Sequence, residues 1–114
     1  MVLAECHLDD LHPLYAEVAR LLAPDGILVL VGYHPHFLRK GVPTHFDRAD
    51  GSAVAIQDHI HRFGDPTEAA FSAGFALIEM TEGSIDDGWV AKHPSDAKHR
   101  NQPVSFCMVW RKGA

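Results

Sequence analysis

The sequence predicts one α/β domain, residues 1–114, in which helices pack against a sheet of about four strands. Two observations support this prediction. Apolar runs of strand length recur along the chain, and the segment before the second run has the spacing of an amphipathic helix. In addition, 114 residues are enough for one hydrophobic core and too few for two.

The centre of the chain is the segment 21–35, which combines a helix end, a turn and a strand. Pro24 cannot continue the preceding helix, and Gly26 is expected to take the positive φ that ends it. Five consecutive apolar residues follow at 27–31, too few for a helix and too continuous for a strand with one wet face. We therefore predict a parallel strand that is buried on both faces.

A strand and a helix precede this turn. The short apolar stretch 2–6 predicts a strand. In 11–22 the apolar residues recur at the spacing of one helical face, with Asp9 or Asp10 as the N-cap. Because one short crossover connects them, strands 2–6 and 27–31 are expected to lie side by side and parallel.

The second half of the chain predicts a hairpin, a short helix, two further strands and a long irregular segment. The hairpin centres on the Asp50-Gly51 turn, and the helix follows Asp65, a capping residue before a proline. Irregular connections as long as the one predicted are uncommon and tend to be lids or binding loops. The ranges are 44–48 with 53–61 for the hairpin, 67–73 for the helix, 75–80 and 104–110 for the strands, and 83–102 for the irregular segment.

Composition and charge exclude several classes of function. The formal net charge of −5 gives no basic footprint for nucleic acid. No apolar run approaches the roughly 20 residues of a membrane helix, and the N-terminus lacks the pattern of a signal peptide. We therefore expect a cytoplasmic protein with no nucleic-acid or membrane partner. Cys6 and Cys107 are expected to be reduced, buried thiols.

A recognisable pattern extends over several segments of the chain, namely the helix, Pro-Gly turn and strand at 15–30, His34-Pro35, Ala73-Gly74-Phe75, and 103–106 with 109–112. These segments resemble the C-terminal half of the class I S-adenosylmethionine-dependent methyltransferases that act on small molecules. The similarity covers nearly the whole chain. It implies a partial Rossmann-like sheet in which the predicted strands correspond to the family's strands in the order 4-5-7-6, with the last strand antiparallel and the hairpin as an insertion.

The resemblance also indicates which parts of the family's fold have no counterpart in this sequence. These are the first three strands, the glycine-rich loop beside the methionine part of the cofactor, and the acidic residue that holds the ribose. Gly-x-Gly-x-x-Gly does not occur in the sequence. Strand 2–6 is then an edge with unpaired backbone groups. We expect it to bind a second copy of the chain or a separately made N-terminal half.

The first candidate site residues stand where strand 2–6 ends, because α/β proteins bind ligands at the carboxyl ends of parallel strands. The resemblance implies that Glu5 and Cys6 face the methyl-bearing end of S-adenosylmethionine. His7 is a catalytic candidate, either as a general base or as a group that orients the substrate. The alternative for His7 is a loop histidine that caps the next helix.

Further candidates follow the other predicted elements. His34 is the second catalytic candidate and Tyr33 a substrate contact, since both come after strand 27–31. His59 adds a substrate contact from the hairpin. Trp89 is either an aromatic lid on the substrate or a plug over the core.

A metal site on the hairpin is a further interpretation, because His59 and His61 share one strand face and His45 stands opposite. The sequence has neither a cysteine pair nor a His-Glu-x-x-His helix, and we therefore predict no metal ion.

The resemblance, taken with these residues, implies transfer of a methyl group from S-adenosylmethionine to a small-molecule acceptor, with this chain forming the acceptor-side wall. Because the glycine-rich cofactor loop is absent from the sequence, we do not expect the chain to be active alone. The alternative is a non-catalytic interaction half-domain that completes a partner's sheet or forms a homodimer by strand addition.

Overall fold

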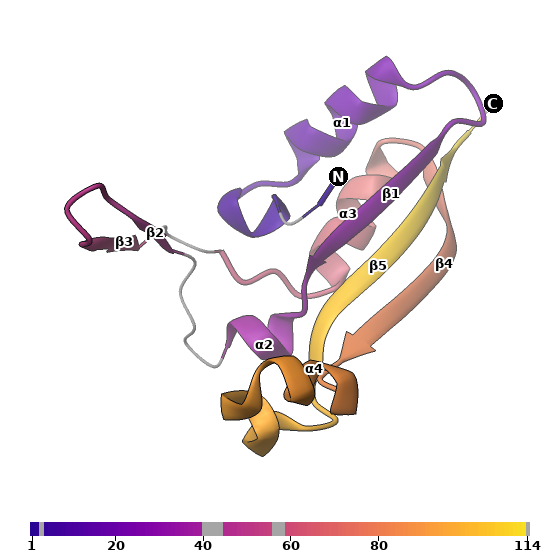
Figure 1. Ribbon diagram of the computed structural model, residues 1–114. Coiled ribbons are helices and arrows are strands. Elements are labelled where there is room, and N and C mark those ends of the chain that lie inside the picture. Colours follow the sequence, from indigo (N-terminus) through magenta and orange to yellow (C-terminus); the bar gives the residue numbers. More distant parts are fainter. Residues whose placement is uncertain (3, 40–44, 56–58, 114) are drawn as a thin grey trace.

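A sheet with two helices packed on one side forms the body of the protein in the computed structural model (Figure 1). The structure describes residues 1–113 except 3, 40–44 and 56–58. The elements in chain order are η1 (Glu5–His7), α1 (His12–Leu21), β1 (Ile27–Tyr33), α2 (Pro35–Leu38), β2 (His45–Asp47), β3 (Ala53–Ala55), α3 (Gly64–Ser72), β4 (Phe75–Ser84), α4 (Asp87–Lys92), η2 (Pro94–His99) and β5 (Pro103–Lys112).

The main sheet has three strands in the order β1-β5-β4, and β5 is antiparallel to both neighbours. Met108 of β5 pairs with Leu30 on one side and with Met80 on the other. The register of β4 shifts between Leu77 and Glu79, as at a β-bulge. The last strand is thus inserted between two earlier ones, which confirms the order implied by the resemblance.

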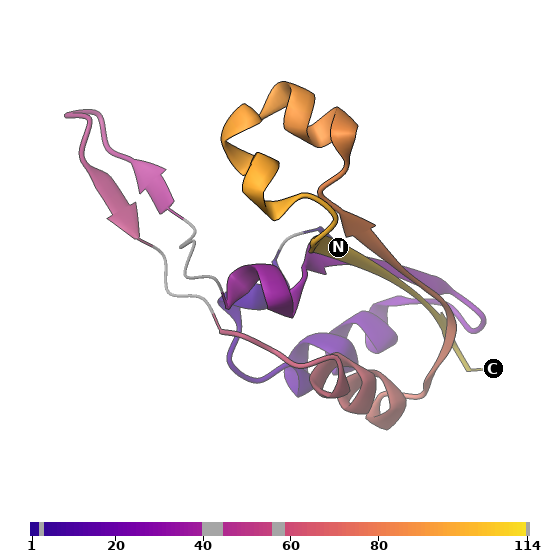
Figure 2. The same cartoon turned by 90° about the horizontal axis from the view of Figure 1, so that it is seen from below.

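The hydrophobic core lies between this sheet and the helices α1 and α3, which Figure 2 shows on the same side of the strands. Alternate residues of a strand face opposite sides. Leu28 and Leu30 face the core, whereas Ile27 and Val29 are 44% and 45% exposed. The prediction that 27–31 is buried on both faces is therefore wrong, because both packing helices cover the same face.

Among the described residues of the predicted strand 2–6, the structure has one isolated bridge. Val2 pairs with Val31 in the parallel sense, and the amide of Val31 donates to the carbonyl of Met1 over 2.9 Å. This confirms the parallel position beside β1, but the chain then turns into η1 and the strand does not continue. A helical turn satisfies its own backbone groups, whereas an edge strand needs a neighbour to do so.

Helix boundaries differ by a few residues from those predicted. α1 begins at His12, whose amide donates to the Asp10 carboxylate over 3.0 Å, so the predicted acid acts from just outside the N-cap position. α3 begins one residue before Asp65, whose carboxylate accepts from the amide of Arg62 over 3.1 Å. The longest described helix, α1, has ten residues, and no helix in the described ranges has the length and apolar character needed to cross a membrane.

In the turn before β1, the positive φ of 62° belongs to Asp25 and not to Gly26. Aspartate tolerates this conformation better than most residues because its short side chain can bond to the local backbone. Gly26 is required for a different reason, since a Cβ there would lie 2.8 Å from the carbonyl oxygen of Ala23.

The predicted hairpin is confirmed around the Asp50-Gly51 turn, where Gly51 has a φ of 85° and the Asp50 carboxylate accepts from the amide of Ser52 over 2.9 Å. Its strands, β2 and β3, are shorter than predicted. Residues 56–58 of the predicted second strand, and the side chain of His45, lie outside what the structure describes.

The prediction of an irregular segment at 83–102 is wrong. Its first residues complete β4, and the short helices α4 and η2 follow. Figure 2 shows both helices at the end of the sheet, away from α1 and α3. Asp86 caps α4, its carboxylate accepting from the amide of Trp89 over 2.8 Å. A six-residue helix is too short to show a clear apolar period, so only the cap could have indicated it.

The one-sided core predicts different costs for truncating neighbouring residues of β1. Leu30→Ala removes a fully buried side chain and should lower the free energy of unfolding by about 2–5 kcal/mol. Val29→Ala, on the exposed face, should cost less than about 1 kcal/mol. Urea unfolding of both variants at low protein concentration measures the difference. Equal costs would contradict the one-sided core.

Candidate functional site

A small pocket forms where η1, β1, α2 and residues 59–61 meet, and we call it the η1 pocket. Four of the site residues predicted from the sequence, namely Glu5, Cys6, Tyr33 and His59, lie together in it. The other lining residues are Gly32, Leu38, His61 and Phe106.

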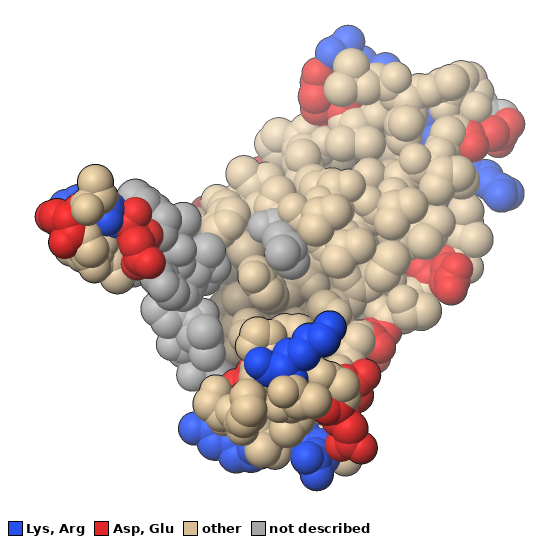
Figure 3. All heavy atoms as spheres, viewed as in Figure 1, with Lys and Arg blue, Asp and Glu red and all other residues tan. Residues whose placement is uncertain are grey.

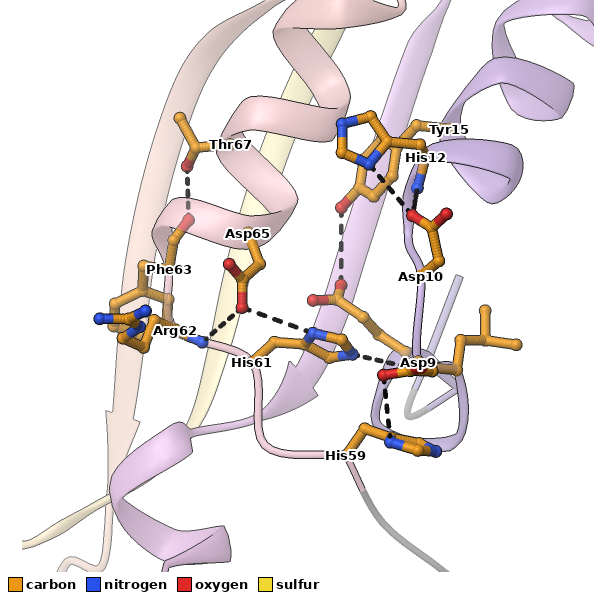
Figure 4. Close-up of polar contacts among 12 residues, drawn as sticks. Asp9, Asp10, His12, Tyr15, His59, His61, Arg62, Phe63, Asp65 and Thr67 are labelled. Carbon is orange, nitrogen blue, oxygen red and sulfur yellow. Dashed lines mark hydrogen bonds and ion pairs between the residues drawn. The ribbon is translucent and has the colours of Figure 1, made fainter.

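The η1 pocket is closed on one side by backbone contacts between η1 and residues 59–61. The amide of His59 donates to the carbonyl of Cys6 over 2.6 Å. The Nε2 of His61 lies 2.6 Å from the carbonyl oxygen of Leu8, and its Nδ1 lies 3.6 Å from the carboxylate of Asp65 (Figure 4). Segments more than fifty residues apart in the sequence are thus held side by side.

Glu5 is the buried charged group of the η1 pocket. Its side chain is only 4% exposed, and the Tyr15 hydroxyl donates to it over a long 3.5 Å contact. Burial raises the pKa of Glu5 from 4.5 to about 7, with the negative charge of Asp65 adding a smaller increase. The charge of His61 and the Tyr15 hydrogen bond act in the opposite direction. A carboxyl group with a near-neutral pKa in a pocket can exchange a proton with a ligand at physiological pH.

The remaining walls of the η1 pocket are aromatic and apolar. Gly32 lets the ring of Phe106 lie against the backbone of β1, because a Cβ at this position would come within 2.8 Å of that ring. Tyr33 stacks on Phe37 with a centroid distance of 5.6 Å and an interplanar angle of 25°. The η1 pocket therefore presents a largely apolar surface next to one carboxyl group.

The two predicted catalytic histidines lie outside the η1 pocket. His7 is exposed beside it, with Nε2 3.8 Å from the Sγ of Cys6. His34 is 8% exposed and caps α2, its Nδ1 accepting from the amide of His36 over 3.0 Å, while its Nε2 contacts the carboxylate of Glu82. His34 lines a second pocket, called the cationic pocket here, with Pro35, His36, Arg39, Arg62 and Phe63.

Trp89 lies apart from both pockets, on α4. Its indole N–H donates to the carboxylate of Asp96 over 2.8 Å, and its ring lies against His93. In Figure 1, α4 stands beyond the end of the sheet. The structure therefore places Trp89 over neither the η1 pocket nor the core.

Some lining residues could not be singled out from the sequence. Phe106 lies more than forty residues from the next pocket residue, and nothing in its apolar strand distinguishes it. His61 could be found only as the partner of His59. Within the part of the chain that the structure describes, no three His, Cys, Asp or Glu side chains are placed to hold a metal ion.

The raised pKa of Glu5 predicts a pH-dependent stability. Glu5 binds its proton more tightly in the folded than in the unfolded chain, so its stabilising effect is complete below about pH 4.5 and is lost as the pH rises through about 7. The loss should be about 3 kcal/mol of unfolding free energy. Glu5→Gln should not show this loss, whereas Glu79→Gln, at an exposed position of β4, should behave like the wild type.

Chemical denaturation between pH 4.5 and pH 8 provides the measurement. The difference between Glu5→Gln and the wild type isolates the contribution of Glu5, because all other ionisable groups are common to the two proteins. A constant difference across this range would show that Glu5 keeps its ordinary pKa.

No protein-family model and no curated protein matches the sequence. Among solved structures, an S-adenosylmethionine-dependent methyltransferase from Mesorhizobium loti is 21% identical, with a TM-score of 0.70 over 97% of this chain and 59% of that chain. A protein named as a methyltransferase of the same kind, from Listeria monocytogenes, is 14% identical, with a TM-score of 0.71 over 99% of this chain and 59% of its own.

A third structure, the cyclase SpnF, is 18% identical, with a TM-score of 0.56 over 99% of this chain and 49% of that one. The sequence identities are low, so these comparisons establish the fold through the agreement of the backbone over nearly the whole chain. The chain has the fold of the S-adenosylmethionine-dependent methyltransferases and spans about 59% of the length of the Mesorhizobium and Listeria proteins.

Proposed function

We propose that the chain takes part in methyl transfer from S-adenosylmethionine to a small molecule and forms the acceptor-side wall of that site. The observation that carries this proposal is the η1 pocket, in which Glu5, Cys6, Tyr33 and His59 meet beside the carboxyl end of β1. The fold shared with methyltransferases from two bacteria supports the reaction class.

The described residues fit only the reacting end of the cofactor. S-adenosylmethionine supplies an electrophilic methyl group on a sulfonium centre. The η1 pocket offers apolar walls from Leu38 and Phe106 and one carboxyl group, which suit a methyl-bearing cation. No Gly-x-Gly-x-x-Gly loop for the rest of the cofactor occurs in this sequence. We therefore propose that residues outside this sequence supply the remaining contacts.

Glu5 is the residue best placed to take the proton of the methyl acceptor. Its pKa of about 7 leaves a substantial fraction of the carboxylate available near neutral pH. Glu5 would accept the proton that the acceptor atom loses when that atom receives the methyl group supplied by the cofactor. Tyr33 and His59 hold the acceptor in line. Cys6 lies beside Glu5 against the methyl-bearing end.

This proposal predicts weak binding of the demethylated cofactor to the chain alone. S-adenosylhomocysteine should shift the backbone NMR signals of Cys6 and Tyr33 with a dissociation constant on the order of 1 mM. Binding is weak because this chain contacts only one end of the ligand. The indole signal of Trp89, on α4, is the internal control. Tyr33→Ala should weaken the binding further. The proposal fails if millimolar ligand moves none of the η1-pocket signals.

A second candidate function is an interaction half-domain, and the open face of the sheet favours it. Ile27 and Val29 are nearly half exposed on this face, and Val2 at the neighbouring edge is 65% exposed. Figure 3 shows the surface over the sheet with few charges, which gather at its rim. Apolar side chains on an uncovered sheet are typical of a protein interface. We propose that a second copy covers this face and the adjoining edge at Val2.

The dimer proposal predicts that the molecular mass depends on concentration and on Val29. Sedimentation or light scattering should show a dimer that Val29→Glu converts to a monomer, since a charge on the open face would be buried without a partner. Leu21→Glu, at an exposed end of α1, is the matched control and should remain dimeric. A wild-type monomer at high concentration contradicts the dimer. Circular dichroism must show that both variants are folded.

A further inference from the structure

The cationic pocket lies beside α2, and its lining joins α2 to the turn that precedes α3. None of the four residues that the proposed function places at the methyl-transfer site lines it, namely Glu5, Cys6, Tyr33 and His59.

Short-range hydrogen bonds hold the α2 side of the cationic pocket. The ring of His34 caps the helix by accepting from the amide of His36, and the amide of Arg39 donates to the carbonyl of Pro35 over 3.0 Å. Residues three apart on a helix face the same side. His36 and Arg39 are therefore presented together.

Arg62 enters from the other side, and its backbone is equally fixed. Its amide donates to the Asp65 carboxylate over 3.1 Å, and the amide of Asp65 donates back to the carbonyl of Arg62 over 2.9 Å. Figure 4 shows the Arg62 side chain pointing away from Asp65 and His61. Asp65 thus fixes the turn without neutralising the guanidinium group.

Both guanidinium groups of the cationic pocket lack a carboxylate partner among the described residues. Arg20 and Arg100, in contrast, pair with Glu17 and Asp87. Two acids contact lining residues without contacting a guanidinium group: Asp65 accepts from the backbone amide of Arg62, and the carboxylate of Glu82 contacts the Nε2 of His34. In a protein with a net charge of −5, two unpaired arginines at one hollow create a local positive field.

We propose that the cationic pocket binds small molecules through a phosphate or carboxylate group held by Arg39 and Arg62. The planar guanidinium fork matches the oxygen pairs of both anions and forms charge-assisted hydrogen bonds. His36, exposed beside Arg39, offers a further ring donor. The edge contact of Phe63 with His34, at a centroid distance of 5.0 Å, gives the site a rigid floor.

The test is an NMR titration with inorganic phosphate and, separately, with acetate, at constant ionic strength maintained with sodium chloride. Either anion should move the side-chain signals of Arg39 and Arg62 along a saturable curve. The anion that binds more tightly at equal ionic strength identifies the preferred group. This readout needs neither the methyl donor nor an active enzyme, so a failed methyl-transfer proposal leaves it unchanged.

Charge-removing variants assign the site. Arg39→Gln and Arg62→Gln should each weaken phosphate binding by about tenfold or more, since each removes a charge-assisted pair. Arg48→Gln, at an exposed position next to the hairpin turn, is the matched control and should bind like the wild type. Unsaturable shifts, or equal binding by all three variants with folded spectra, would overturn the proposal.

Discussion

The insertion of β5 between β1 and β4 is the constraint on which the rest of the structure depends. β5 pairs with both β1 and β4. The three-stranded sheet therefore cannot form before the C-terminal segment of the chain is in place. The inward residues Met108 and Trp110 of β5 are also fully buried in the core. Pairings between residues this far apart in the sequence carry a large loop-closure entropy. We therefore expect the sheet to form late and cooperatively.

The ionised form of Glu5 destabilises the folded chain, because its carboxylate is buried beside another acid. Removing a carboxylate from water is costly, and Asp65 adds a second negative charge nearby. His61 and the long Tyr15 contact offset only part of that cost, as the raised pKa shows. An apolar residue at this position would avoid the cost of removing a carboxylate from water. A carboxyl group that is buried in a pocket despite this cost is a candidate for a functional role.

The sequence predicted the regular elements well because their signals are local and periodic. The apolar spacing of α1 and the continuous run of β1 located both elements within two residues, and the Asp50-Gly51 turn located the hairpin. The predictions failed where tertiary context decides. η1 replaces most of a strand, and the exposure of Val29 depends on which face the helices cover.

The candidate site was only partly predictable for the same reason. Glu5, Cys6 and Tyr33 were found because they stand at the ends of predicted strands, where the general rule for α/β proteins places ligands. Phe106 and Leu38 carry no polar signal, and they enter the η1 pocket only through the pairing of β5 and the position of α2. Arg39 and Arg62 are joined by the fold alone, across a predicted hairpin.

The short helix α2 ties both pockets to β5. The amide of His34 donates to the carbonyl of Val104 over 3.0 Å, which fixes the start of α2 to the beginning of β5. Phe63 of the cationic pocket then contacts Phe106 of the η1 pocket edge to face, at 5.2 Å. Because interiors are closely packed, a shift of β5 along its neighbours moves both walls together. The register of one strand therefore sets the shape of two separate sites.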